Sequence, residues 1–209
     1  MTILMLDNVR RALALPGFDA RDAWQKMAPR PRPLERPSDQ AGEVKLAGVL
    51  LLLYPLNGGL AFSLTRRTDK VADHKGQISL PGGMRESGET LSQTALRETC
   101  EEVRVCVDES SIIGALTPLY LSVSDFEIAP FVGYVDTPPG FDPNPDEVAE
   151  MIEIPLPLLL DNTIKTQERW NLRGMELDVP FYRVNGDAVW GATAAILSEF
   201  EWRLRAILA

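Results

Sequence analysis

The pattern of hydrophobic and polar residues predicts several β-strands along the chain. Residues 45–54 are rich in valine and leucine, which is typical of a buried strand, and a turn at 55–59 leads to a returning strand at 60–66. Asn185-Gly186 is a strong hairpin signal between residues 181–184 and 188–190. Further strands are expected at residues 77–80, 112–117, 126–135 and 149–154, with polar loops at 70–76 and 136–147.

Helical periodicity appears in fewer places. The best helix is expected at residues 91–103, and a closing helix at 191–208 has Ile196, Phe200 and Leu204 at a spacing of four. Residues 7–15 suit a short helix, and residues 156–160 suit one helical turn. Several strands with two substantial helices predict an α/β fold in which a mixed β-sheet lies between helices.

A proline-rich run at residues 29–37 divides the chain, because its prolines cannot lie inside helices or central strands. We expect an N-terminal extension at 1–42 and a single domain at 43–209. The extension is either a dimer arm, which would make the protein a homodimer, or a lid over the functional site. The sequence leaves both alternatives open.

Composition and charge narrow the functional class. The chain has 209 residues, of which 45% are hydrophobic, and this is enough for one domain with a sizeable core. A net charge of −9 argues against a nucleic-acid-binding or anionic-membrane surface, since both need a positive field. No apolar run approaches the roughly 20 residues that span a bilayer. The N-terminus lacks the order of a signal peptide, so a cytoplasmic location is expected.

Two cysteines, Cys100 and Cys106, are too few and wrongly spaced for a disulfide framework or a zinc site.

The helix at 91–103 concentrates carboxylates on one side. At 100° per residue, Ala95, Thr99, Val103, Leu96 and Cys100 form a core-facing stripe about 140° wide. Glu98, Glu101 and Glu102 fall in an arc of about 100° that we assign to the opposite side. Their mutual repulsion and the helix dipole both disfavour this arrangement, and a divalent cation would remove both penalties. Oxygen ligands at this spacing suit Mg²⁺ or Mn²⁺, although a solvated acidic face is the simpler alternative.

The spacing of residues around these glutamates is distinctive. Gly83, Glu89, Arg97, Glu98, Glu101 and Glu102 form the pattern Gly-x5-Glu-x7-Arg-Glu-x2-Glu-Glu over residues 83–102. This pattern resembles the signature box of Nudix hydrolases. The resemblance implies an α/β/α sandwich and Mg²⁺-dependent hydrolysis of a nucleoside diphosphate linked to another group, with Mn²⁺ as a substitute ion.

The resemblance also implies roles for individual residues. Glu98, Glu101 and Glu102 would bind the metal, with a backbone carbonyl near Gly83 as a further ligand. One carboxylate would act as base for the attacking water, with Glu98 as first choice and Glu147 as second. Arg97 belongs to the same catalytic group, and its pairing with Glu89 would fix the preceding loop against the helix.

One position departs from the family pattern. The family has glycine after Glu-Glu-x, where it ends the helix in a left-handed conformation, and this chain has Arg104. Either Arg104 adopts that conformation at a cost of about 1 kcal/mol, or the helix ends differently. No ligand is lost, so we expect catalysis to survive.

A second motif lies upstream of the box. Residues 63–83 resemble the extra motif of the coenzyme A diphosphatase branch of the family. Four basic residues stand against two acidic ones in this segment, which suits a substrate with several phosphates, although they could simply offset their neighbours. The positions that match this motif are Leu64, Thr65, Arg67, Gly76, Pro81, Gly82 and Gly83. The positions that depart from it are Ser63, Thr68, Ala72 and Leu80. The side chains expected to contact the substrate are those of Arg66, Arg67, His74, Lys75 and Gln77.

Two other functions are also compatible with the sequence. The first keeps the chemistry but changes the small-molecule substrate to ADP-ribose, NADH or a dinucleoside polyphosphate, for which Tyr120 is a hint. The second is a Nudix-fold binding module without turnover. Such modules usually lose box glutamates, and this chain keeps all of them.

Overall fold

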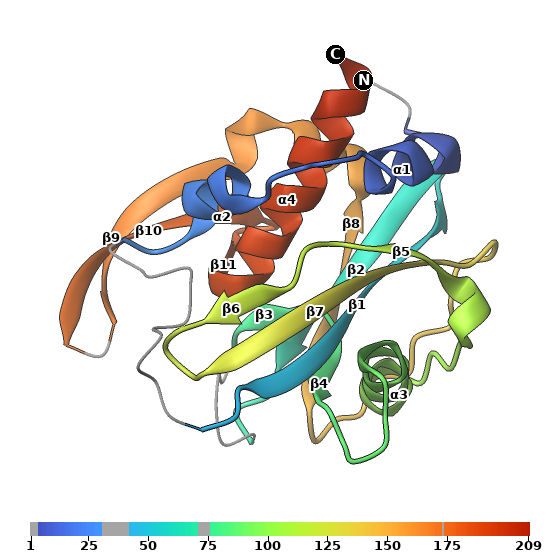
Figure 1. The fold of residues 1–209 in the computed structure, drawn as a ribbon, viewed down its shortest axis with the longest axis horizontal. Coiled ribbons are helices and arrows are strands. Elements are labelled where there is room, and N and C mark those ends of the chain that lie inside the picture. The colour runs from blue at the N-terminus through green and yellow to red at the C-terminus, as the bar shows by residue number, and fades with distance from the viewer. Residues whose placement is uncertain (1–3, 31–41, 71–75, 173) are drawn as a thin grey trace.

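Two layers of helices enclose a mixed β-sheet in the computed structural model of the chain (Figure 1). The structure describes residues 4–30, 42–70, 76–172 and 174–209. Within them, the main sheet has the strand order β3-β2-β1-β7-β5; β4 also pairs with β1, β6 with β7 and β8 with β2. The strands are β1 Lys45–Leu56, β2 Gly59–Arg67, β3 Ile78–Ser79, β4 Gly82–Met84, β5 Ile112–Ala115, β6 Leu119–Leu121, β7 Phe126–Tyr134 and β8 Val148–Pro155.

Two long helices lie on opposite faces of this sheet. They are α3, Leu91–Val103, and α4, Gly191–Leu208. Alternate residues of β1 point to the two sides, as the twofold period of a strand requires: Leu51 and Leu53 join the core cluster of α4, whereas Leu50 and Leu52 join that of α3. Because β1 and β7 are parallel and their other neighbours are antiparallel, the sheet is mixed, and the predicted α/β/α sandwich is confirmed.

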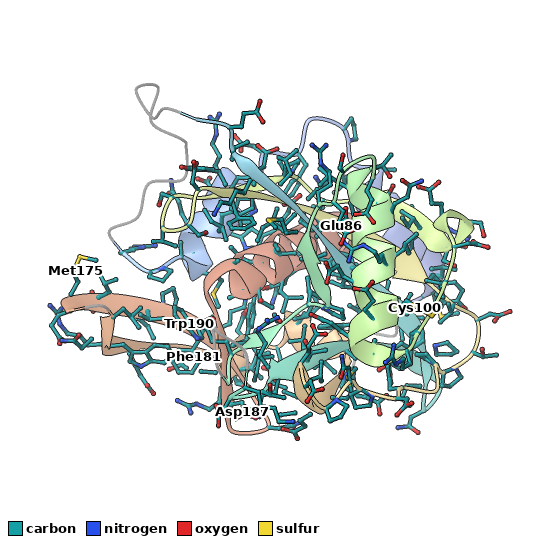
Figure 2. All side chains as sticks on the ribbon, turned by 90° about the horizontal axis from the view of Figure 1, so that it is seen from below. Glu86, Cys100, Met175, Phe181, Asp187 and Trp190 are labelled. Atoms are coloured by element: carbon teal, nitrogen blue, oxygen red, sulfur yellow. A yellow bond between two sulfur atoms is a disulfide. The ribbon has the colours of Figure 1, made fainter. Side chains whose placement is uncertain are left out.

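A smaller sheet projects from the α4 side. It contains β9 Lys165–Leu172, β10 Met175–Val184 and β11 Asp187–Trp190 in the order β11-β10-β9. Figure 2 shows Met175 at the far end of its projecting hairpin. The β10–β11 turn at Asn185-Gly186 was predicted, but β9 was not, because its sequence KTQERWNL lacks hydrophobic alternation. Short 3₁₀ helices complete the chain: η1 Glu109–Ser111, η2 Leu156–Leu160 and η3 Asn162–Ile164.

The N-terminal helices pack on α4. They are α1 Leu6–Leu13, predicted at 7–15, and α2 Arg21–Met27, which was not predicted. Buried side chains such as Val9, Trp24 and Met27 belong to the main core cluster. The described part of the first 42 residues therefore lies across the sheet from α3 and does not cover that helix (Figure 1). Most of the proline-rich run lies outside the described residues.

Helix α3 begins at the residue that its sequence predicts. Thr90 is the N-cap: its hydroxyl accepts from the backbone N–H of Gln93, whose side chain accepts from the N–H of Thr90. Gly48 of β1 lets the helix approach, since a Cβ there would collide with the carbonyl oxygen of Leu91. The helix ends at Arg104, which adopts the left-handed conformation with φ 58° and ψ 24°. The first of the two alternatives for this position is therefore the one observed.

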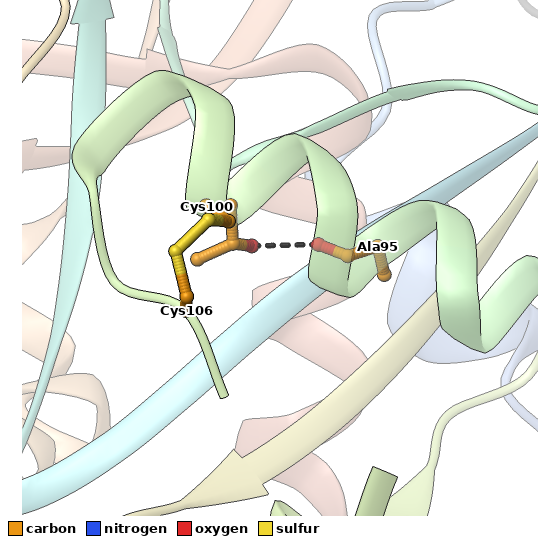
Figure 3. Close-up of a disulfide and its surroundings, with 4 residues drawn as sticks. Ala95, Cys100 and Cys106 are labelled. Carbon is orange, nitrogen blue, oxygen red and sulfur yellow. Dashed lines mark hydrogen bonds between the residues drawn. A yellow bond between two sulfur atoms is a disulfide. The ribbon is translucent and has the colours of Figure 1, made fainter. Parts of the chain in front are cut away.

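The two cysteines form a disulfide across the end of α3 (Figure 3). This single bridge was not predicted, because two cysteines at this spacing do not make a disulfide framework. The left-handed turn at Arg104 reverses the chain, so the Cα atoms of Cys100 and Cys106 lie 4.4 Å apart. Cys100, expected in the core stripe, is only half-buried, and Cys106 is exposed.

The strand expected at 77–80 does stop before Pro81, since β3 ends at Ser79, but the pairing of Gly82–Met84 as β4, antiparallel to Ala47–Val49 of β1, was not predicted. A second difference concerns one of the glutamates. Glu102 was assigned to the polar side of α3, yet it is only 3% exposed. The helical wheel explains this burial, because seven steps of 100° bring Glu102 to within about 20° of Ala95. None of the described helices combines the length and the apolar character that crossing a membrane would require.

Candidate active site

The glutamates of the sequence pattern lie on the face of the sheet that α3 covers. Glu98, Glu101 and Glu102 occupy the last turns of α3, beside β4 and the end of β2. Their exposures differ: the side chain of Glu101 is 53% exposed, that of Glu98 17% and that of Glu102 4%. Burial therefore increases from Glu101 through Glu98 to Glu102, and only Glu101 and Glu98 are accessible to water.

Arg97 links Glu89, Glu98 and Glu101 in one network of hydrogen bonds. Its Nε and Nη2 donate to the two carboxylate oxygens of Glu89, at 2.7 and 3.2 Å. Its Nη1 donates to Oε1 of Glu98 at 2.9 Å and to Oε2 of Glu101 at 3.1 Å, and Nη2 also donates to the carbonyl of Met84. The expected Arg97–Glu89 pair is thus present, and it joins the loop before α3, marked by Glu86 in Figure 2, to the helix.

Glu102 is an acid buried at the centre of the site. Burial raises its pKa to about 8; the charges of Glu98 and Glu147 add to this effect, whereas Arg67 and the backbone N–H of Gly82 oppose it. One oxygen lies 3.6 Å from Nη1 of Arg67, and the other, Oε2, is buried without a hydrogen-bond partner. Such an atom is costly in a folded protein and calls for a ligand.

Glu98 packs directly against the glycine loop. A Cβ on Gly83 would lie 2.4 to 2.6 Å from the carboxylate of Glu98, so a larger residue would displace the end of that side chain. Burial raises the pKa of Glu98, Arg97 counteracts the rise, and the charges of Glu101 and Glu147 contribute to it. The backbone of Gly83 therefore lies beside a largely buried carboxylate, and its role as a carbonyl ligand stays a prediction.

The expected substrate contacts are separated by the alternation of β2. Arg67 points to the α3 side, where it pairs with Glu102 and its Nε is buried without a hydrogen-bond partner. Arg66 points to the other side and pairs with Glu150 at 2.9 Å and with Asp187 at 2.5 Å. Gln77 is half-buried, and its carbonyl accepts from the backbone N–H of Arg67 at 2.9 Å. His74, Lys75 and Ala72 lie outside the described residues.

A loop at residues 142–147 completes the site. Its Glu147 is close enough to Glu98 and Glu102 for its charge to raise the pKa of both. The backbone N–H of Asn144 donates to the carbonyl of Glu102 at 2.8 Å, which fixes the loop to the end of α3. Glu147 had been only a second choice for the base, and Asn144 had not been singled out, because these contacts depend on a fold that brings distant residues together.

Tyr120, the hint of a polyphosphate substrate, is buried on β6, and its hydroxyl donates to Asp125 at 3.0 Å.

The carboxylates do not form a closed metal cage here. Among the described residues, no three histidine, cysteine or acidic side chains are arranged to hold a metal ion. Arg97 accounts for this, since its guanidinium lies between Glu98 and Glu101. The unpartnered Oε2 of Glu102 and the carboxylate of Glu98 nevertheless offer hard oxygen donors, which fit Mg²⁺ or Mn²⁺ better than a softer ion.

Comparisons with known proteins agree with this geometry. The NUDIX domain family matches residues 45–170, which include the whole glutamate helix and the loop of Glu147. The chain is 37% identical over 142 residues to "Uncharacterized Nudix hydrolase NudL" of Pectobacterium atrosepticum, covering 65% of this chain and 71% of that protein. It is 29% identical over 167 residues to "Nudix hydrolase 3" of Caenorhabditis elegans, covering 72% and 70%.

A solved structure supports the fold. The chain is similar to a MutT/nudix family protein from Enterococcus faecalis, with a TM-score of 0.55 and 14% identity over 95% of this chain and 73% of that one. The signature spacing, the carboxylates beside the glycine loop and the family match over more than half of the chain lead to one conclusion. The chain belongs to the Nudix hydrolase family.

Proposed function

We propose that this protein hydrolyses the diphosphate bond of coenzyme A or an acyl-CoA to 3′,5′-ADP and (acyl-)4′-phosphopantetheine, with Mg²⁺ as its cofactor. As a Nudix hydrolase, it acts on a nucleoside diphosphate derivative, and enzymes of this family use divalent cations. The choice of coenzyme A and of Mg²⁺, with Mn²⁺ as a substitute, is the proposal.

The observation that carries the proposal is the position of Arg67. This residue belongs to the upstream motif of the coenzyme A diphosphatase branch, and its guanidinium lies beside Glu102 with a buried, unpartnered Nε. A guanidinium in that state is suited to a phosphate oxygen, which would supply the missing acceptor. The contacts of Gln77, His74 and Lys75 with substrate stay predictions, and Arg66 would first have to leave its two ion pairs.

The departures from the motif are compatible with this substrate. Ser63 and Leu80 are each 3% exposed and Thr68 is 8% exposed, so their side chains contact other residues of the protein. The hydroxyl of Thr68 donates to the carbonyl of Asp146, so this departure supports the loop that contains Glu147. Ala72 lies outside the described residues, and it is the departure on which the choice of substrate still depends.

Each residue has a separate task in the proposed reaction. Glu98 and Glu102, with the Gly83 carbonyl and Glu101, would hold the cation, which when bound offsets phosphate charge and activates water. Arg67 would orient the diphosphate, and Arg97 holds the helix and its preceding loop together. A carboxylate within hydrogen-bond reach, Glu98 or Glu147, would accept the proton of the attacking water.

A product assay tests the proposal. Purified protein is incubated with coenzyme A, dephospho-coenzyme A, ADP-ribose, NADH and diadenosine polyphosphates, with Mg²⁺ or with EDTA, and products are identified by mass spectrometry. We expect 3′,5′-ADP from coenzyme A only with Mg²⁺, and slower cleavage without the 3′-phosphate. Cleavage of ADP-ribose with coenzyme A untouched would contradict the substrate and favour the first rival function.

The same assay tests the metal assignment through Glu102. Glu102→Gln should lower turnover by at least about 100-fold, because it replaces a buried anionic ligand with a neutral amide. Far-UV circular dichroism should show an unchanged fold, since burial favours the uncharged state. Glu176→Gln, which alters an exposed carboxylate on the projecting hairpin, is the matched control and should retain full activity. A fully active, folded Glu102→Gln protein would exclude Glu102 as a ligand.

The remaining predictions from the sequence are a cytoplasmic location, the absence of nucleic-acid and membrane partners, and a role for the first 42 residues as a homodimer arm or as a lid over the site.

A further inference from the structure

The loop at residues 142–147 is attached to the carbonyl end of α3. The backbone N–H of Asp142 donates to the carbonyl of Val103 at 3.1 Å, and that of Asn144 donates to the carbonyl of Glu102 at 2.8 Å. The last carbonyls of a helix have no partner within the helix, so the loop satisfies two of them. One of these two carbonyls belongs to the buried glutamate of the site.

Asn144 uses all its polar groups to shape the loop. Its carbonyl accepts from the backbone N–H groups of Glu147 at 3.0 Å and Val148 at 2.8 Å. Its side-chain Oδ1 accepts from the N–H of Asp146 at 3.2 Å, and its Nδ2 donates to Oε1 of Glu147 at 3.0 Å. Asn144 thus contacts Glu102 through its own N–H and the carboxylate of Glu147 through its amide.

The backbone around Asn144 is restricted from both sides. Pro143 and Pro145 flank it, and the following proline excludes the helical conformation at Asn144. On the far side of the loop, the N–H of Thr68 donates to the carbonyl of Glu147 at 2.9 Å, and its hydroxyl donates to the carbonyl of Asp146 at 3.0 Å. Little rotational freedom remains between the end of β2, this loop and α3.

We propose that Asn144 is a positioning residue for hydrolysis: its amide holds the carboxylate of Glu147 beside Glu98 and Glu102, so that Glu147 faces the reacting phosphate. The inference rests on the proposed function as a diphosphate hydrolase but not on the identity of the substrate. An amide fits this task because it donates one hydrogen bond without the full charge of a guanidinium. Only Oε1 of Glu147 accepts from Asn144, so its second oxygen is available for the proton of the attacking water.

The contrast with Glu98 supports this division of roles. Glu98 accepts from the guanidinium of Arg97 at 2.9 Å and packs on Gly83, where a metal ligand is expected. Glu147 has a neutral donor and belongs to a different segment of chain. Two carboxylates with different partners can serve as ligand and as base in one site.

The test uses Asn144→Asp, which preserves size but replaces the amide donor with a second carboxylate. On whichever diphosphate the wild-type protein cleaves, we expect kcat to fall about 10- to 100-fold, with KM changed less than about threefold. Asp146→Asn, in the same loop, removes only the exposed pair with Lys70 and should leave both constants unchanged. A normal kcat for Asn144→Asp, or an equal loss for Asp146→Asn, would overturn the inference.

A double variant separates positioning from simple loop stability. In Asn144→Asp combined with Glu147→Gln, donor and acceptor are exchanged, so the hydrogen bond can form again in the opposite direction. We expect its thermal stability to return to within about 2 °C of wild type while kcat stays as low as that of Glu147→Gln alone. Recovery of kcat together with stability would show a merely structural role and contradict the inference.

A structural readout keeps this inference separate from the proposed function. If the wild-type protein cleaves no diphosphate, the proposed function fails. The crystal structure of Asn144→Asp then decides the positioning claim, because the Glu147 carboxylate should leave its place beside Glu98 and Glu102. A carboxylate that stays in place would contradict the claim.

Discussion

Arg97 is the residue on which most charges of the site converge. Its guanidinium binds Glu89 through two nitrogens and also reaches Glu98 and Glu101. Hydrogen bonds from Arg97 lower the pKa of Glu89 to about 2 from an ordinary value of 4.5, with further help from Glu86 N–H and Thr94. The ionised form of Glu89 is therefore favoured by the fold.

A pH-dependent contribution to stability follows from this depressed pKa. The contribution of ionised Glu89 is fully present above pH 4.5, the unfolded value, and is lost as the pH falls toward about 2. Glu89→Gln should therefore be less stable than wild type at pH 7, and the difference should shrink below pH 4.5. Urea denaturation of both proteins between pH 7 and pH 3 measures this.

The control for that series is Glu86→Gln, which alters an exposed carboxylate in the same loop. Its effect on the free energy of unfolding should be small at pH 7. A Glu89→Gln difference that stays constant down to pH 3 would show that the Arg97–Glu89 pair adds no pH-dependent stability.

Some single-residue features of the site could be predicted from the sequence, and others could not. The Arg97–Glu89 pair was predicted, and the left-handed conformation of Arg104 was one of two alternatives, because each depends on neighbours within one helix end or one loop. The helical wheel places Glu102 next to the buried Ala95, but Glu102 was assigned to the solvent-facing side of the helix. Asn144 could not be found this way, since its partners Glu102 and Glu147 come together only through the sheet.

At the scale of elements, the end of α3 contains a backbone conformation that favours glycine. Arg104 holds φ 58° while its N–H donates to the carbonyl of Cys100 at 3.0 Å, and the Cys100–Cys106 disulfide bridges the same turn. A non-glycine residue in this conformation costs about 1 kcal/mol. The disulfide limits the ways in which the turn could relax.

Arg104→Gly should therefore raise the free energy of unfolding by about 1 kcal/mol, because glycine adopts positive φ without a Cβ penalty. Urea denaturation of the oxidised protein measures the change. Arg104→Ala is the matched control: it removes the same side chain but keeps the Cβ, so it should not stabilise. Equal stabilisation by both variants would mean that the arginine side chain, and not the backbone, carries the cost.

Elements were predicted well where local signals were strong. The bounds of α3 and α4 match residues 91–103 and 191–208, since periodicity and caps define them. β4 was missed because Gly82 and Gly83 are poor strand formers, and Gly82 lies so close to β1 that a Cβ there would collide with the carbonyl oxygen of Gly48. β9 was missed because an edge strand with exposed faces needs no hydrophobic alternation.

At the scale of the molecule, α4 joins the N-terminal helices to the rest of the fold. Its Glu199 is fully buried, and it accepts from the indole N–H of Trp24 at 3.2 Å, from the N–H and hydroxyl of Thr117 and from Arg203. Helix α2, the segment before β6 and α4 therefore share one carboxylate. The boundary predicted at residue 43 divides a hydrophobic core that is continuous in the structure.

Trp24→Phe tests whether the first helices unfold with the domain. The change removes one donor from a fully buried carboxylate, and we expect the free energy of unfolding of the whole chain to fall by about 1 to 3 kcal/mol. Far-UV circular dichroism in urea should show a single transition, shifted to lower urea. Met5→Ala, at a side chain that is 61% exposed in the same segment, should stay within about 0.5 kcal/mol of wild type. If residues 1–42 were an independent extension, Trp24→Phe would leave the main transition unmoved, because the core around α4 would not depend on that segment.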